Sequence, residues 1–249
     1  MSENVLDYTT WLAGDPMGPF FEKLNSLDPE SVRGTARFKF VTMGFRGLYF
    51  DILTMFRLIG QIMRRLNRDI VNLGKPMPKK WLPSDPEDDL FNVLSLVKVD
   101  FASLIIFLGI LLEKVARLLH NISVGNRPYE IRFSKWRDEI RNGKYVVPDD
   151  LKELMENTPW YDEFHKLRNK YTVHWGYSVG GIVKFISSIS LQLLSHYKKD
   201  AEIIYEVNDI NKLCKDILNF FTEFNDFLCD NFHLFPIRIT TSSEVDDDG

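Results

Sequence analysis

The sequence predicts a mainly α-helical protein, and three of its features carry that prediction. Two long segments place apolar residues at three- and four-residue steps, which is the period of a helix with one buried face. A third segment near the C-terminus does the same, and a proline-rich stretch separates the first two. We therefore expect an up-and-down helical bundle built on two long antiparallel helices.

Three regions are expected along the chain. Residues 1–30 are rich in Gly, Pro and Asp and lack periodicity, so they predict an irregular N-terminal arm packed on the body. Residues 31–239 predict a single helical domain, and residues 240–249 predict a disordered acidic tail. Within the domain, alternating and β-branched residues predict a small β-hairpin insertion near 184–207, although its first segment also fits a helix.

The first long helix is expected from Ser31 to about Leu73. Its apolar residues form one stripe: Ile52, Met55, Phe56, Ile59, Ile62, Met63, Leu66 and Ile70. Arg57, Arg64 and Arg68 fall on the opposite side. Two interpretations of this basic face stay open, namely a face solvated by water and a face that contacts an RNA backbone.

The second long helix is expected from Leu90 to Asn121, after the four prolines of residues 74–89. It is apolar on nearly every side through its middle, so we expect it to be central to the core. Asp100 interrupts that apolar surface. Because burying a lone carboxylate is costly, Asp100 is expected either to have a structural partner or to line a site.

Shorter helices are expected between the second long helix and the last one. Ser134 is expected to cap a basic helix that ends at Gly143. Thr158, followed by proline, predicts the start of a further helix that runs into Arg168. The last long helix is expected from Asn208.

The charge of the chain neither requires nor excludes a nucleic-acid partner. The formal net charge is −4, but four acidic residues lie in the last six positions, and the rest is balanced. The N-terminus has no secretory pattern, and the longest apolar stretch, residues 101–112, is shorter than the roughly 20 residues that cross a bilayer. Cys214 and Cys229 lie about 22 Å apart along one expected helix, so both are expected as free thiols. These features predict a cytoplasmic protein with no membrane partner.

The segment HKLRNKYTVHW, residues 165–175, brings an arginine and a histidine close together in sequence. Asn169 follows Arg168 directly, and five residues separate Arg168 from His174. About one such Arg/His spacing is expected by chance in a chain with fourteen arginines and five histidines. The setting of the pair therefore matters more than its spacing.

An undistorted helix would point the side chains of Arg168 and His174 about 120° apart. Residues 171–173 are poor helix formers and are soon followed by glycine, so the helix can end there and let both side chains converge on one phosphate. An arginine can hold a phosphate bidentately, and a histidine can move a proton to or from a ribose hydroxyl. Such a site needs no metal.

The helical plan and the segment LRNKYTVH resemble the HEPN superfamily, whose signature is an arginine, often followed by asparagine, and a histidine, with four to six residues between the arginine and the histidine. The resemblance implies a helical domain that dimerises through the motif face and, in many members, cleaves RNA without a metal in toxin–antitoxin or antiphage defence systems. It implies that Arg168 and His174 are catalytic and that Asn169 supports them. The implied partners are RNA, a second copy, and a cognate antitoxin or regulatory protein, with no cofactor.

Two functions fit this motif: a metal-independent endoribonuclease, and a catalytically silent HEPN-like module that binds RNA or protein. A purely structural interpretation is also open, in which Arg168 complements a helix dipole and His174 is a surface histidine. Tyr171 and His165 are further candidates for the site lining, and Trp175 for stacking on bases. The histidines have no metal-ligand spacing, so no metal site is expected.

Overall fold

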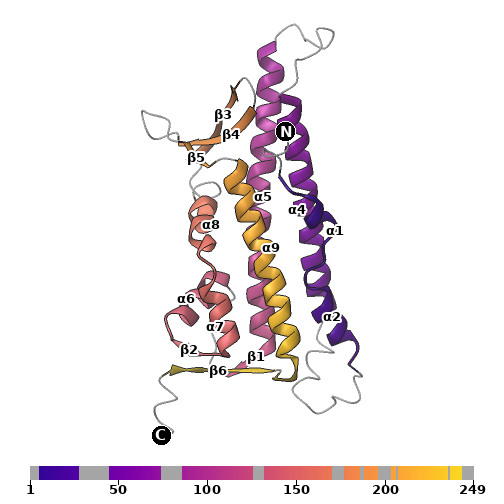
Figure 1. The fold of residues 1–249 in the computed structure, drawn as a ribbon, viewed down its shortest axis with the longest axis vertical. Helices are drawn as coiled ribbons and strands as arrows, with labels where there is room; N and C mark the ends of the chain where they lie inside the picture. Colours follow the sequence, from indigo (N-terminus) through magenta and orange to yellow (C-terminus); the bar gives the residue numbers. More distant parts are fainter. Residues whose placement is uncertain are drawn as a thin grey trace. The chain divides into compact units, whose positions relative to one another are not determined.

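The computed structural model describes residues 6–27, 45–73, 86–125, 132–169, 177–185, 188–195, 203–205, 207–234 and 236–242 (Figure 1). The helices are α1 (Thr9–Ala13), α2 (Gly18–Asn25), α4 (Phe45–Leu73), α5 (Pro86–Ile122), α6 (Phe133–Arg141), α7 (Asp149–Glu156), α8 (Trp160–Arg168), α9 (Val207–Asp230) and the short 3-10 helix η3 (Phe232–Leu234). The strands are β1 (Ser123–Gly125), β2 (Tyr145–Val146), β3 (Tyr177–Phe185), β4 (Ser188–Ser195), β5 (Ile203–Tyr205) and β6 (Ile237–Thr241). Most described residues are helical, which confirms the mainly α class.

The chain forms two compact units. The first contains residues 1–14, 56–109 and 161–216, and the second contains residues 15–55, 110–160 and 217–249. The three long helices α4, α5 and α9 each contribute one part to each unit. The motif arginine belongs to the first unit.

The described part of the N-terminal region, residues 6–27, contains two short helices, so it is less irregular than expected. In the first unit, Trp11 of α1 stacks on Phe56 of α4 with ring centroids 5.0 Å apart. The backbone of Leu6 exchanges two hydrogen bonds with the buried side chain of Asn67, donating to Oδ1 at 2.7 Å and accepting from Nδ2 at 2.6 Å. In the second unit, α2 buries Phe20 and three other residues. These helices are too short for a visible period, and their contacts with other elements define them.

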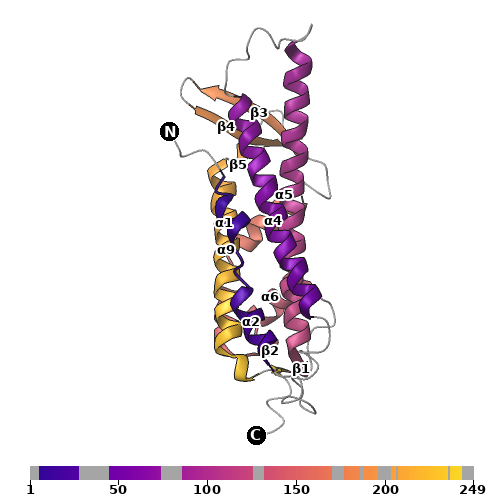
Figure 2. The same ribbon diagram turned by 90° about the vertical axis from the view of Figure 1, so that its right-hand side faces the viewer.

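The two longest helices are antiparallel, as expected. In the first unit Arg65 of α4 pairs with Asp100 of α5, and in the second unit Asp51 of α4 pairs with Lys114 of α5. Later positions of α4 therefore meet earlier positions of α5. Within each unit, the parts of α4 and α5 lie side by side (Figures 1 and 2).

Helix α5 contributes many core residues, as expected, but one of its faces is exposed. Val97, Phe101, Leu104, Ile105 and Leu108 are almost completely buried. By contrast, four aliphatic side chains are more than a third exposed: Leu96, Val99, Ile106 and Ile110. The apolar composition of α5 therefore exceeds what the core of one chain uses.

The predicted hairpin exists and is longer than expected. In the first unit β3, β4 and β5 form an antiparallel sheet in that order. The expected pair of strands corresponds to β4 and β5, and β3, residues 177–185, is an additional strand. The register shifts between Val179 and Gly181, so Gly180 lies at a bulge.

The second unit contains a small sheet with the strand order β1-β6-β2. It also contains α6, α7 and the later part of α9. The end of α6 matches the expectation at Gly143, which has a φ of +67°. Its amide donates to Ile140 O and the next amide donates to Glu139 O, both at 3.0 Å, which is a Schellman ending. Residues 240 and 241 belong to β6, so the tail begins later than expected, and residues 243–249 lie outside the described residues.

One expected helix cap is wrong. Position 132 precedes α6, and no side chain caps it there, so Ser134 lies inside the helix. The hydroxyl of Thr158 donates to Met155 O at 2.7 Å and accepts from Arg137 Nε at 2.8 Å. The buried guanidinium of Arg137 also donates to Thr158 O at 3.2 Å. Helix α8 begins at Trp160, directly after the Thr-Pro pair that predicts a helix start. Within the described ranges, no helix combines the length and hydropathy that crossing a bilayer requires.

Candidate functional site

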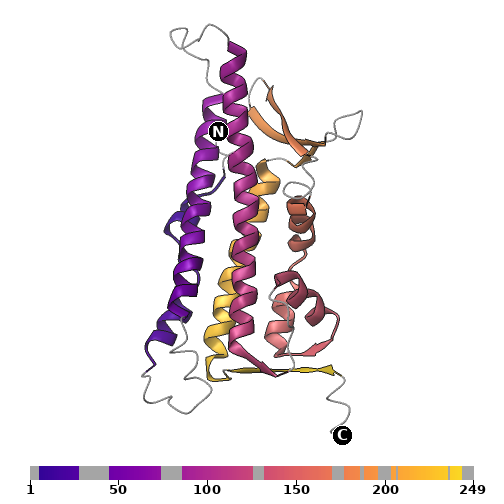
Figure 3. The ribbon, with the colours of Figure 1, turned by 180° about the vertical axis from the view of Figure 1, so that it is seen from behind.

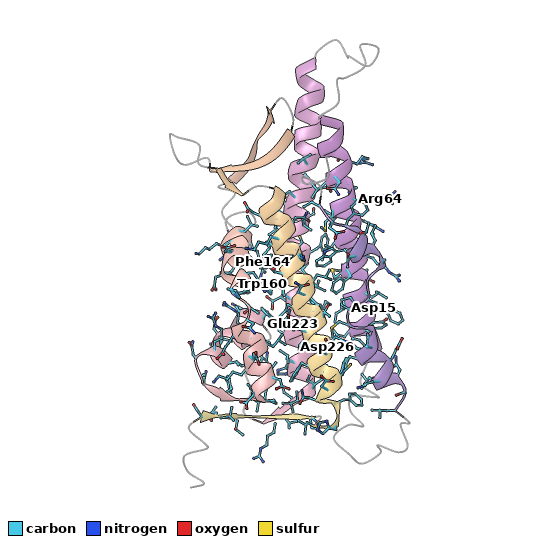
Figure 4. The ribbon with its side chains drawn as sticks, viewed as in Figure 1. Asp15, Arg64, Trp160, Phe164, Glu223 and Asp226 are labelled. Atoms are coloured by element: carbon cyan, nitrogen blue, oxygen red, sulfur yellow. The ribbon has the colours of Figure 1, made fainter. Side chains whose placement is uncertain are left out.

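Helix α8 holds the motif arginine in its last turn. Its apolar residues fall on one face, and Trp160, Phe164 and Leu167 are buried, as the sequence predicts. Figure 4 labels the first two of these side chains. Arg168 is half-buried, at the boundary between that apolar face and solvent. A half-buried guanidinium can face a ligand while its aliphatic stem stays packed.

The side chain of Arg168 lies directly on the backbone of α5 at Gly109. A Cβ added to Gly109 would stand 3.2 Å from Arg168 Nε, 3.3 Å from Cδ and 3.4 Å from Cζ. Separations of this size are tighter than nine in ten real Cβ contacts, so with a larger residue at 109 the arginine would have to move by a few tenths of an ångström. The absence of a side chain at Gly109 therefore sets where Arg168 rests.

Sequence reasoning missed Gly109, although a signal is present. It interrupts the aliphatic run of residues 101–112, in the interior of a helix of 37 residues. A glycine there costs about 1 kcal/mol relative to alanine, so its presence calls for a packing reason. The contact with Arg168 supplies that reason.

The side chain of Asn169 faces His165 on the preceding turn of the chain. Asn169 Nδ2 lies 3.3 Å from His165 Nδ1 and 3.4 Å from Nε2. The exposed imidazole of His165 also stacks on Tyr161, with ring centroids 5.9 Å apart. The side chains of Asn169 and His165 therefore lie side by side at the end of α8.

Three predicted site residues lie outside the described residues, namely Tyr171, His174 and Trp175. Their roles stay predictions.

Asp100 has the structural partner that was one of its two expected roles. Arg65 donates to it bidentately, with Nε to Oδ2 at 3.0 Å and Nη2 to Oδ1 at 2.8 Å. The hydrogen bond and charge of Asp100 raise the pKa of the Arg65 guanidinium above its ordinary value, although partial burial opposes the shift. The pair joins α4 to α5 within the first unit.

The basic face of α4 is exposed. Arg57, Arg64 and Arg68 all lie on the surface, and Arg64 extends away from α4 in Figure 4. Arg68 donates to Asp69 at 3.0 Å while remaining 64% exposed, so this contact leaves the guanidinium open to solvent. These three arginines present positive charge along one side of α4 within the first unit.

No family model matches the chain, and no similar protein was found among curated sequences or solved structures.

The two cysteines are free thiols, and burial raises the pKa of Cys214 to about 12. In the part of the chain that the structure describes, no three His, Cys, Asp or Glu side chains gather as metal ligands would.

Proposed function

We propose that this chain is an endoribonuclease of the HEPN type that cleaves RNA without a metal ion. The observation that carries the proposal is the placement of Arg168, half-exposed at the end of α8 and seated on Gly109 of α5. A mid-helix glycine that makes room for one arginine is a costly arrangement, and it lets the guanidinium pack against the backbone of α5. Holding a guanidinium in place is what stabilising a reacting phosphate requires.

In the proposed reaction, the ribose 2′-hydroxyl attacks the adjacent phosphorus and the bond to the 5′-oxygen breaks. His174 accepts the proton of the 2′-hydroxyl or donates a proton to the leaving 5′-oxygen. Arg168 binds the phosphate oxygens while negative charge builds on them. The products are a 2′,3′-cyclic phosphate and a free 5′-hydroxyl.

The same proposal includes partners. One chain supplies one Arg168 and one His174, whereas the reaction needs a proton acceptor, a proton donor and positive charge between them. A homodimer that joins two motif faces would supply all of these. The exposed arginines Arg57, Arg64 and Arg68 are the proposed contacts to the RNA backbone, and a toxin–antitoxin or antiphage setting would add an antitoxin or regulatory protein.

The test is cleavage of RNA by the purified protein in excess EDTA. One RNA oligonucleotide that is cut is then remade with a single 2′-deoxyribose at the cut position. We expect cleavage of the all-ribose strand in EDTA, a cyclic phosphate at the new end, and no cleavage at the deoxy position.

Cleavage that stops with EDTA, or that proceeds equally at the deoxy position, contradicts the proposal. Binding of RNA with no cleavage under any condition contradicts it too, and favours the silent binding module instead.

A further inference from the structure

Three side chains form a row along α8 in the first unit. Tyr161, His165 and Asn169 follow one another at steps of four residues, so they stand on one face of the helix. Tyr161 is buried, His165 is exposed and Asn169 is partly exposed. The row therefore begins in the core and reaches the surface in the last turn of α8.

The imidazole of His165 is supported on one face and open on the other. Its ring stacks on that of Tyr161, with centroids 5.9 Å apart and planes inclined by 26°. Because Tyr161 is only 4% exposed, the supporting ring is itself packed in the core. The other face of the imidazole is open to solvent, since His165 is exposed. An aromatic ring with one open face is the kind of group on which an unpaired nucleobase stacks.

The amide of Asn169 lies at the edge of this ring. Nδ2 is 3.3 Å from His165 Nδ1 and 3.4 Å from Nε2. Within the described ranges the Asn169 side chain has no other hydrogen bond, so its Oδ1 can still accept one. Proteins bind the edges of unpaired RNA bases through such donors and acceptors. His165 and Asn169 thus combine a stacking face with a polar edge.

Arg168 stands beside this row. His165 and Arg168 are three positions apart, which brings their Cβ atoms to about 5–6 Å on a helix. The Arg168 side chain packs on Gly109 of α5, and Figure 3 shows α8 running alongside α5 in this unit. The base and the phosphate of one nucleotide are joined through a single ribose. One nucleotide can therefore meet both side chains.

We infer that His165 and Asn169 form a nucleobase subsite beside Arg168, and that this subsite selects an unpaired purine. The inference rests on the proposed function, because it takes the phosphate bound by Arg168 as part of an RNA strand. A base that is paired within a duplex is not free to stack on a side chain, so the strand is single here. A purine covers more of the imidazole than a pyrimidine does, and stacking strength sets such preferences.

The test measures the binding of strands that cannot be cleaved. The probes are short 2′-O-methyl oligomers of equal length, one carrying adenine, one carrying uracil and one without bases. Fluorescence anisotropy at one fixed salt concentration gives the dissociation constants. Wild type should bind the adenine strand about tenfold more tightly than the abasic strand, with the uracil strand between them.

Two variants separate the base contact from the phosphate contact. His165→Ala should weaken binding of the adenine strand about tenfold and leave the abasic strand unchanged, because the ring contacts only a base. Arg168→Ala should weaken binding of both strands by the same factor, because both keep their phosphates. The matched control is His233→Ala, at an exposed histidine of the second unit, which should change neither.

Two further variants examine the contacts of the subsite. His165→Phe keeps a flat ring, so it should keep the preference for the adenine strand over the abasic strand. Asn169→Ala removes a hydrogen bond to the edge of the base. It should weaken binding of the adenine and uracil strands about fivefold and leave the abasic strand unchanged.

Equal affinity of wild type for the adenine and abasic strands overturns the inference, as does a His165→Ala variant that loses affinity for both equally. A His165→Phe variant without the preference contradicts stacking, and equal binding of adenine and uracil strands contradicts the choice of a purine. None of these strands can be cleaved, so a purine preference without cleavage of ordinary RNA contradicts only the proposed function. A chain that binds no strand contradicts both.

Discussion

Replacing Gly109 by alanine separates the position of Arg168 from the stability of the fold. The added Cβ would meet Arg168 Nε at 3.2 Å and Cδ at 3.3 Å, so the arginine must move by a few tenths of an ångström. The atoms that must yield belong to a flexible and half-exposed side chain, not to backbone. The guanidinium should therefore shift while the helices stay where they are.

Gly109→Ala should raise the stability of the fold slightly and lower the rate of RNA cleavage. Alanine in a helix interior is more stable than glycine by about 1 kcal/mol. Displacing the Arg168 side chain removes part of that stabilisation. We expect a net stabilisation of about 0.5 kcal/mol, which raises Tm by about 1–2 °C in a chain of this length. A misplacement of about 1 Å can cost 100-fold in rate, so a smaller shift of Arg168 should lower kcat about tenfold.

The assay combines thermal unfolding with single-turnover RNA cleavage for Gly109→Ala and Gly47→Ala. Gly47 also lies on a long helix, but a Cβ there meets nothing within 4 Å, so Gly47→Ala should leave the cleavage rate unchanged. A Gly109→Ala variant with the full rate would refute the argument that Gly109 sets the position of Arg168. A variant that unfolds several degrees earlier would show that the contact is ordinary packing.

Two further predictions use other contacts. Gly60→Ala should destabilise the chain by about 1–2 kcal/mol, because its Cβ would lie 2.9 Å from the backbone nitrogen of Leu12, and backbone cannot move aside as a side chain can. Chemical denaturation measures this loss of stability, and an unchanged denaturation midpoint would contradict the prediction. Burial raises the pKa of Cys214 to about 12 and also raises that of Cys229. A fraction of only about 10⁻⁴ of the Cys214 side chains is therefore thiolate at pH 8. A disulfide reagent should modify Cys214 at that pH no faster than the chain unfolds. Immediate reaction of both thiols in the folded chain would contradict the burial of Cys214.

The long helices were predictable because their apolar period extends over many turns. The end of α4 at Leu73 matches the sequence expectation, and α5 extends only a few residues beyond its expected limits. The short helices α1 and α2 were not predictable, since their stability comes from distant residues such as Phe56 and Asn67. The local spacing of apolar residues in the sequence does not indicate such long-range contacts.

The position of Arg168 at the end of a helix was predictable from the sequence, whereas its surroundings were not. The sequence places Arg168 at the end of a helix, and the structure agrees. It did not indicate that Gly109 lies under the guanidinium or that Arg65 pairs with Asp100, because both contacts join residues far apart in the chain. The hydrogen bond from Arg137 to the hydroxyl of Thr158 was not predictable for the same reason.

The central claim is that Arg168 and His174 together cleave RNA without a metal ion. The most direct measurement is the single-turnover cleavage rate in excess EDTA for wild type, Arg168→Ala and His174→Ala, each checked for folding by circular dichroism. Lys152→Ala, on the exposed face of α7, is the control. We predict that wild type and the control cleave at the same rate and that each motif variant loses about 10² to 10⁴ in rate while staying folded. Motif variants that stay within a few-fold of the wild-type rate would contradict the account.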